Sequence, residues 1–250
     1  MTEAVPTRKY KHPPVAEAIC EFVFAPGESW DPTIPGRLYE LLRGEYEERP
    51  TVLQTMEAQL DGPEGLKVHL SQTADGVQFR NSRATKYVRI GPRGLSIHTT
   101  EQPYRGWEET FLPQIRHAAR ALSRTATDMR VNRIGIRYVN RMPGVKDAGQ
   151  ARVLVTTLPP PLDFVVPEPS QFMARVEHKR EDGSKVLLTT AKTDLPEEAL
   201  ILDIDVIRDA IDPAITFEQA LELLQDLKVA ESGVFEAAIT PEARSSFDVD

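Results

Sequence analysis

Arginines recur at four-residue spacing in two short segments of the chain. In a helix this spacing places side chains about one turn apart on one side, and in a strand it directs them to one face of the sheet. Guanidinium groups bind carboxylates and phosphates through two-point contacts. The pattern therefore predicts a site for an anionic ligand, a nucleic-acid backbone or an acidic protein partner. The residues that would form it are Arg116, Arg120, Arg133, Arg137 and Arg141.

The basic residues are concentrated in the middle of a chain that is acidic overall. Residues 80–141 hold thirteen basic and four acidic side chains, a net charge of +9, whereas the whole protein carries −8. From Asp194 onward, fifteen acidic side chains accompany three basic ones, a net charge of −12. The acidic C-terminal third could therefore neutralise the arginines within the fold instead of leaving them to a partner. The sequence leaves both interpretations open.

Two carboxylates, Asp203 and Asp205, lie two residues apart in the strand-like segment LILDIDVI. On one face of a strand such a pair could hold Mg²⁺ or divide acid and base roles, and it could equally pair with arginines across the sheet. The five histidines lack the HxH, HxxxH and HExxH spacings of metal sites; they are His12, His69, His98, His117 and His178. We favour the ion-pair interpretation and expect no cofactor.

Signatures of nucleophilic catalysis and of nucleotide binding are missing from the sequence. It contains no GxSxG, SxxK, GxxxxGK[ST] or GxGxxG. Cys20, the single cysteine, lies in an apolar strand-like segment, where a core role is the simplest interpretation. A binding protein is therefore favoured over an enzyme. The alternative is an enzyme with an unrecognised carboxylate-based site at Asp203 and Asp205.

The composition also predicts where the protein acts. Residues 1–12 lack the apolar stretch of a signal peptide, and no segment approaches the ~20 apolar residues of a membrane span. A lone cysteine fits a reducing compartment. We expect a cytoplasmic protein without membrane contact and with a flexible N-terminus over residues 1–12. A homodimer is one option that the sequence does not decide.

Apolar residues that alternate with polar ones predict strands, and in three other segments apolar residues recur at helical spacing. Helices are expected between Pro35 and Pro50, from near Trp107 to Leu122, and from Thr216 to Val234. Pro113 would kink the second helix or delay its start. The expected strands cover residues 15–24, 51–60, 66–71, 77–81, 86–90, 95–99, 131–141, 152–157, 171–180, 185–193 and 200–207.

The order of these elements repeats along the chain. A strand, a short helix, several strands and a long helix are followed by a strand, several strands and a long helix. This indicates an internal duplication whose second copy has lost its short helix, with the loop at 142–151 in its place. We expect α+β halves at 13–142 and 143–250, packed as one unit. The fold class is an antiparallel sheet with two long helices on one face, as in the TATA-binding-protein-like architecture.

Two segments resemble the signature blocks of a protein family. HPPVAEAICEF at residues 12–22 and RIGIRYVNR at residues 133–141 are similar to the paired motifs of a sporadically distributed family of uncharacterised bacterial proteins of about this length. VFEAAIT at residues 234–240 is similar to that family's ending, although Leu227-Lys228 stands where a Leu-His pair often precedes it. The resemblance spans essentially the whole chain and implies one architecture and a bacterial origin, but no activity. The family's patchy distribution is typical of defence or mobile-element operons.

The two blocks also have a structural interpretation. Glu17 and Glu21 point to the same side of the first strand, and Arg137 lies on the second. If the two strands are neighbours, we expect Glu17, Glu21 and Arg137 to form a structural ion-pair ladder. Taken together, the sequence predicts a non-enzymatic accessory protein that engages a protein partner or an anionic ligand, with nucleic acid as a further candidate partner.

Overall fold

The fold is α+β, built on a single antiparallel sheet. The computed structural model describes residues 8–27, 30–61, 67–160 and 168–248, and of these residues 55–61 and 67–74 by their backbone alone. Within these ranges nine strands lie in the order β2-β3-β4-β5-β1-β6-β9-β8-β7. The strands are β1 (Val15–Phe24), β2 (Thr51–Asp61), β3 (Lys67–Arg80), β4 (Lys86–Gly91), β5 (Gly94–Thr99), β6 (Val131–Pro143), β7 (Met173–Lys179), β8 (Lys185–Thr193) and β9 (Ala199–Arg208).

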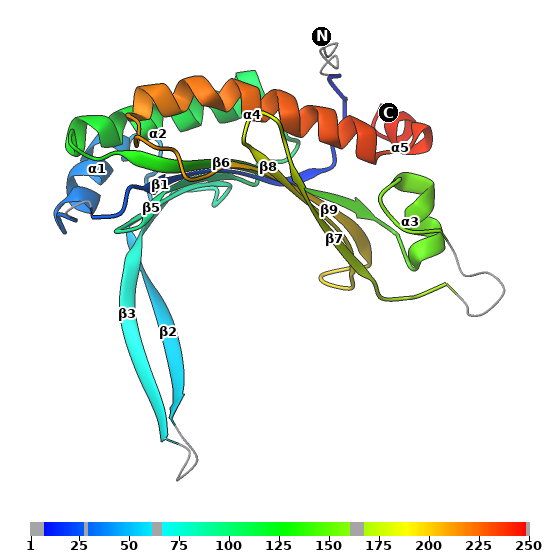
Figure 1. The fold of residues 1–250 in the computed structure, drawn as a ribbon, viewed down its shortest axis with the longest axis horizontal. Coiled ribbons are helices and arrows are strands. Elements are labelled where there is room, and N and C mark those ends of the chain that lie inside the picture. The colour runs from blue at the N-terminus through cyan, green and yellow to red at the C-terminus, as the bar shows by residue number, and fades with distance from the viewer. Residues whose placement is uncertain (1–7, 28–29, 62–66, 161–167, 249–250) are drawn as a thin grey trace.

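Helices cover one face of this sheet, and Figure 1 shows the two longest running side by side across it. The core lies between the two layers, where the inward residues of β1 and β6 alternate with polar ones, as their sequences predict. Phe22 of β1, for example, is fully buried and packs on Phe217 of the last long helix, with ring centroids 5.6 Å apart. The helices are α1 (Ile34–Leu42), α2 (Leu112–Thr125), α3 (Ala148–Leu154), α4 (Phe217–Ala238) and α5 (Pro241–Ser246).

The sheet has the same connectivity on both sides of its centre. β1 and β6 pair with each other, β5, β4 and β3 follow outward from β1, and β9, β8 and β7 follow outward from β6. In each half the first strand is followed by a short helix, α1 or α3, and the last strand by a long helix, α2 or α4. In this order the first run of elements ends with α2 and the second begins with β6, with residues 126–130 between them. The internal duplication and its expected boundary at residue 142 stay predictions.

The second half has kept its short helix, so the expected loss of this helix is wrong, as is the expected strand at 152–157. The side chain of Asp147 accepts a hydrogen bond from the backbone N–H of Gln150, 2.9 Å away, and this N-cap begins α3. The alternating Val153 and Val155 resemble a strand, but Val155 already lies outside the helix in extended backbone. A good cap outweighs the weak strand preference of so short a segment.

Two other expectations are refined by the structure. The second helix starts late: a π turn, η1 (Trp107–Phe111), precedes α2, and Pro113 lies in the first turn of α2, where its missing N–H has no partner to lose. The strands expected at 66–71 and 77–81 belong to one long strand, β3. Its pairing with β2 shifts by one residue between Leu53 and Gln54. This bulge lets β3 stay paired with β2 across the gap between the two expected strands, where the alternation of apolar residues is interrupted.

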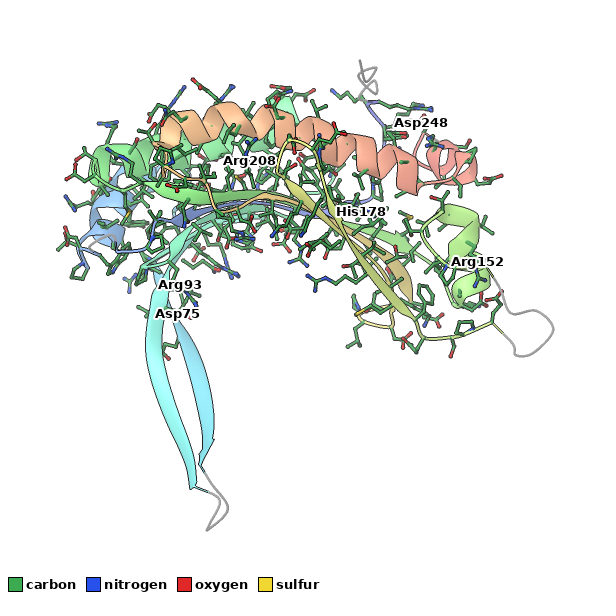
Figure 2. The ribbon with its side chains drawn as sticks, in the orientation of Figure 1. Asp75, Arg93, Arg152, His178, Arg208 and Asp248 are labelled. Carbon is green, nitrogen blue, oxygen red and sulfur yellow. The ribbon has the colours of Figure 1, made fainter. Side chains whose placement is uncertain are left out.

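The β2–β3 hairpin leaves the sheet as a projecting arm, on the side away from the helices (Figure 1). Two glycines face each other where it departs. A Cβ on Gly76 would stand 2.4 Å from the carbonyl oxygen of Ile90, and one on Gly91 would stand 2.2 Å from that of Asp75. The backbones of β3 and β4 can approach this closely only without side chains at these positions. Arg93 binds Asp75 at the same place, with Nη2 3.0 Å from Oδ2. Figure 2 labels both residues near the point where the arm leaves the sheet.

The N-terminal segment packs on the fold through Tyr10, whereas residues 1–7 lie outside the described ranges, and the flexibility expected for residues 1–12 stays a prediction. Tyr10 is 9% exposed, its ring lies edge-on to Phe235 and Phe247, and its hydroxyl donates to Glu236, 2.7 Å away. The segment therefore ties the start of β1 to the end of α4. Among the described helices, none is long and apolar enough to cross a membrane.

Candidate functional site

The sheet face that the helices leave uncovered, here called the open face, carries a strip of ionic side chains across its central strands. Because Ala18, Cys20 and Phe22 point into the core, the alternate residues of β1 point to the open face. The same alternation applies to β6 and β9. The strip holds four carboxylates and three guanidinium groups: Glu17, Glu21, Asp203, Asp205, Arg133, Arg137 and Arg141.

Arg137 is held by a two-point ion pair with Asp203. Its Nε lies 2.8 Å from Oδ1 and its Nη2 lies 2.6 Å from Oδ2. This contact raises the pKa of Arg137 above its usual value. Asp205 stands directly opposite Arg137 in the β6–β9 register and has no hydrogen bond from it. Burial is the main reason why the pKa of Asp205 is raised to about 6, against the attraction of Arg133 and Arg137.

Glu17, Glu21 and Arg137 were expected to form an ion-pair ladder, but each of them has a different partner in the structure. β1 and β6 are neighbours, as the expectation required, but Glu21 binds Arg133, and Arg137 turns to Asp203 on its other side. Glu17 instead accepts hydrogen bonds from β4 and β5. The register between β1 and β6 explains these partners. Gly135 stands opposite Glu21, so Glu21 is diagonal to both Arg133 and Arg137. Because Arg137 has another carboxylate beside it, Asp203, Glu21 pairs with Arg133.

The five predicted binding arginines do not form one site. Arg133, Arg137 and Arg141 lie on the open face, whereas Arg116 and Arg120 lie on α2, on the helical side of the sheet, and both are exposed. Arg141 donates to the carbonyl oxygen of Glu197, 2.6 Å away, and its Nη1 is buried without a hydrogen-bond partner. The structure thus separates an open-face set, largely engaged by carboxylates, from an exposed helical set.

A chain of three polar side chains crosses the open face beside this strip. Ser96 and His98 share one face of β5, and Oγ of Ser96 lies 2.9 Å from Nε2 of His98. Nδ1 of His98 lies 3.0 Å from Oε1 of Glu17 on the neighbouring strand β1. The ring of Tyr87 stacks on His98 with centroids 4.3 Å apart, and its hydroxyl also donates to Glu17. The order hydroxyl, imidazole, carboxylate is that of an activated serine.

The surroundings fix the protonation of this chain. His98 is 6% exposed, and burial lowers its pKa although the hydrogen bond to Glu17 opposes the change. The bonds from His98 and Tyr87 keep the pKa of Glu17 below its usual value. At neutral pH the imidazole is therefore neutral, with its Nδ1–H donated to the Glu17 carboxylate and its Nε2 free to accept the hydroxyl proton of Ser96.

Ser96 also borders a cavity of about 360 Å³ at the base of the β2–β3 arm. The cavity lies between the open face and the arm, and Glu21, Leu53, Arg89 and Arg93 line it together with backbone of the glycine pair. Arg89 stands opposite Ser96 in the β4–β5 register. A small substrate or peptide side chain could enter here and reach the hydroxyl of Ser96 with a guanidinium group beside it.

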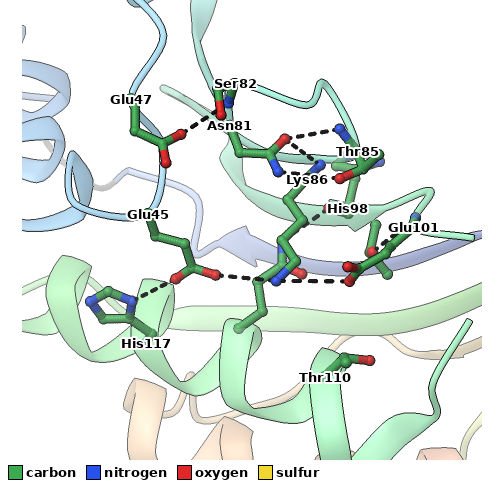
Figure 3. A network of polar contacts seen from close by, with 12 residues as sticks. Glu45, Glu47, Asn81, Ser82, Thr85, Lys86, His98, Glu101, Thr110 and His117 are labelled. Carbon is green, nitrogen blue, oxygen red and sulfur yellow. Dashed lines mark hydrogen bonds and ion pairs between the residues drawn. The ribbon is translucent and has the colours of Figure 1, made fainter.

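A separate polar network joins α2 to the start of β4 (Figure 3). Lys86 of β4 lies 3.7 Å from Glu45 and 3.9 Å from Glu101, and Nδ1 of His117 on α2 lies 3.0 Å from the other oxygen of Glu45. Asn81 accepts the backbone N–H groups of Thr85 and Lys86, each 2.9 Å away. His117 is thus a half-exposed histidine whose Nδ1 is engaged by Glu45.

The metal alternative gains no support from the site. Both carboxylate oxygens of Asp203 are occupied by Arg137. In the described part of the chain, no group of three or more histidine, cysteine, aspartate or glutamate side chains is placed to hold a metal ion. The side chain of His69 lies outside the described residues.

Comparisons with other proteins do not add a functional assignment. No protein-family model matches the chain, and no curated protein matches its sequence. The candidate function therefore has to be argued from the geometry of the open face and of the cavities.

Proposed function

We propose that the chain is a non-enzymatic binding protein that engages a protein partner through the open face. One observation carries the proposal: in the described structure this broad sheet face is covered by no helix, and it is bordered by the projecting β2–β3 hairpin at one end and by the edge strand β7 at the other (Figure 1). The likeness of this plan to the TATA-binding-protein-like architecture stays a prediction, and so does the cytoplasmic location.

The edge strand β7 has features of an interaction element. Met173, on its open-face side, is 75% exposed although it is apolar, and Val176, on the opposite side of the strand, is 46% exposed. β7 pairs with β8 along one edge, and its other edge ends the sheet. Exposed apolar side chains on a sheet edge are typical of surfaces that receive a partner, because a strand of the partner can extend the ladder.

The charge pattern favours a protein over nucleic acid. Binding to a phosphate backbone depends on cations that neutralise phosphates. The arginines of the open face already lie against carboxylates: Arg133 binds Glu21 and Arg137 binds Asp203. Such a balanced strip complements a protein surface of mixed charge, for which alternating signs set orientation and exclude wrong partners.

The test is capture of a partner from a nuclease-treated lysate of cells that naturally produce the protein, with and without a charge swap. Arg137→Asp combined with Asp203→Arg keeps an internal ion pair but exchanges the two charges. We expect the swap to reduce capture at least tenfold, whereas Arg116→Glu with Arg120→Glu on the helical side leaves capture unchanged. Capture that is lost with nuclease, or that the swap leaves intact, would contradict the proposal.

A second candidate function rests on the contacts of 2.9 Å and 3.0 Å that join Ser96, His98 and Glu17. We infer that Ser96 can act as a nucleophile toward an ester. Its oxygen would attack the carbonyl carbon while the hydroxyl proton passes to Nε2 of His98, and the imidazolium would be stabilised by Glu17. As the ester C–O bond breaks, the leaving alcohol takes that proton. Water would then repeat the cycle, releasing the acid and restoring Ser96.

A fluorophosphonate distinguishes this second function from a structural polar cluster. The Ser96 oxygen would displace fluoride from phosphorus, and mass spectrometry would find the adduct on the peptide that contains Ser96. Ser96→Ala should abolish labelling, His98→Gln should slow it by ~10²-fold or more, and Ser123→Ala on α2 should leave it unchanged. No adduct under excess reagent, or an adduct that persists in Ser96→Ala, would exclude Ser96 as the nucleophile.

A further inference from the structure

The helical side of the sheet contains a second and larger cavity, of about 590 Å³. It lies between the N-terminal segment, the loop that leads into η1, and α4, and its floor is formed by Tyr138 and Asn140 of β6. The sheet separates it from the open face. Binding pockets for small organic molecules typically measure ~300–1,000 Å³, so this volume is in the appropriate range.

The walls of this cavity are mainly aromatic and apolar. Trp107 is 8% exposed and lies edge-on to Phe111, and Tyr104 lies edge-on to Tyr138. Phe235 of α4 lines the opposite part. Val229, also on α4, is 47% exposed and lines the cavity where it meets solvent. Rings and proline side chains arranged in this way offer flat contact surfaces to a planar ligand.

The floor carries buried polar groups with hydrogen-bonding capacity to spare. The ammonium group of Lys228 lies 4.3 Å from the centre of the Tyr138 ring and binds Glu231, whose side chain is 3% exposed. Within the described residues this carboxylate is the only acceptor recorded for an ammonium group that has three N–H bonds. The hydroxyls of Tyr104 and Tyr138 lie 2.9 Å apart, a contact that uses one of their two protons.

The tyrosine hydroxyls stay protonated, since burial raises the pKa of both Tyr104 and Tyr138 above the usual value. The floor therefore has N–H and O–H donors that lack acceptors, next to flat apolar walls. A ligand that matches this arrangement has a planar body and a carbonyl or carboxylate group at one end. Unpaired donors in a buried site are costly, so such an acceptor would gain affinity by satisfying them.

We propose that this cavity binds a planar, largely apolar organic molecule whose carbonyl or carboxylate group accepts hydrogen bonds from Lys228 and from the Tyr104–Tyr138 pair, with its ring system against Trp107. The site is independent of the open face, because its residues lie on the other side of the sheet. It gives the protein a small-molecule ligand in addition to a macromolecular partner.

The experiment uses 2-naphthoate as the probe and the fluorescence of Trp107 as the readout. The chain has two tryptophans, so Trp30→Phe leaves Trp107 as the only one. We expect saturable quenching of Trp107, one molecule bound per chain by calorimetry, and much weaker binding of the non-planar adamantane-1-carboxylate. Ser232→Phe should fill the cavity and weaken 2-naphthoate binding at least tenfold.

Two further variants keep the result interpretable. Val229→Phe narrows the mouth from a half-exposed position, and it should weaken binding in the same direction as Ser232→Phe. Val153→Phe adds the same ring on α3, where Val153 is 54% exposed and does not line the cavity, and it should have no effect. Absence of saturable binding, or equal affinity in the parent and both filled variants, would overturn the proposal.

Discussion

Arg137 binds Asp203, its diagonal neighbour on β9, and not Asp205, the residue directly opposite it. This choice leaves the two carboxylates in different states. Asp203 accepts two hydrogen bonds from one guanidinium group, whereas Asp205 is partly buried and its pKa is raised to about 6. The two residues are chemically identical and two positions apart, so their contrast provides a matched pair for experiments.

Asp205→Asn should stabilise the protein above pH 7. Because the carboxyl of Asp205 holds its proton more tightly in the folded chain than in the unfolded chain, stability falls as pH rises from about 4 through about 6. Above that window the ionised carboxylate costs on the order of 1–3 kcal/mol, a cost that asparagine removes. Urea unfolding at pH 4.5 and 7.5 should show the difference between Asp205→Asn and the parent growing with pH.

Asp203→Asn is the control for this experiment. Asparagine cannot accept both bonds of Arg137 as an anion does, so the variant should be less stable than the parent at pH 7.5. If both aspartate variants changed stability in the same direction, the assignment of separate roles to these carboxylates would be wrong.

The Arg137–Asp203 pair should show a modest coupling energy. The Arg137 side chain is 45% exposed and that of Asp203 is 15% exposed, so solvent screens the interaction. A double-mutant cycle with Arg137→Met and Asp203→Asn should give a coupling of roughly 1 kcal/mol. A coupling of zero would mean that the two-point geometry contributes nothing to the free energy of unfolding.

Removing one member of the buried ion pair between Lys228 and Glu231 should destabilise the protein more than replacing both members with apolar residues. With Lys228→Met the carboxylate of Glu231, 3% exposed, would lose its ion-pair partner, and the loss should be about 3 kcal/mol or more. Combining Lys228→Met with Glu231→Leu should recover most of the stability, as measured by thermal unfolding. A double variant as unstable as the single one would indicate that the pair is required for packing and not only for charge balance.

Thr216→Ala should destabilise the protein by about 1 kcal/mol, because it removes the cap of α4. The Thr216 hydroxyl accepts from the backbone N–H of Gln219 at 3.3 Å, and the Gln219 side chain accepts from the backbone N–H of Thr216 at 3.0 Å. Thr33, at the start of α1, makes no such cap bond. Thr33→Ala should therefore change the free energy of unfolding by a few tenths of a kcal/mol at most.

The sequence predicts the helices and strands of this fold better than it predicts which of their side chains contact one another. Alternation in β1 and β6 correctly separates inward Phe22 and Tyr138 from outward Glu21 and Arg137, because a period of two is a local property. The helix expected from Thr216 also begins there, with Thr216 as the N-cap of α4, because capping is a local property as well. α3 was missed because Val153 near its end and Val155 just beyond it alternate like the residues of a strand, and the Asp147 cap that begins the helix is a single residue.

The candidate site depended on contacts that local patterns do not specify. Ser96 and His98 stand two residues apart on one strand, but Glu17, which orients the imidazole, comes from β1, 81 residues from His98. The ion pairs on the open face likewise depend on the register between strands that are far apart in the sequence. The cavity on the helical side was also missed, although the sequence drew attention to Lys228 as the residue in place of a histidine.

The pairing of β1 with β6 has a consequence for how the chain could be divided. Nine residues of β1 are matched to β6 along this central ladder, which joins two halves of like connectivity. Cutting the chain at residues 126–130 would give two fragments, each with one bare strand edge and one half of an apolar layer. Such fragments have the complementarity of subunits, so they should reassemble when mixed, and in the intact chain the segment that joins them raises their local concentration.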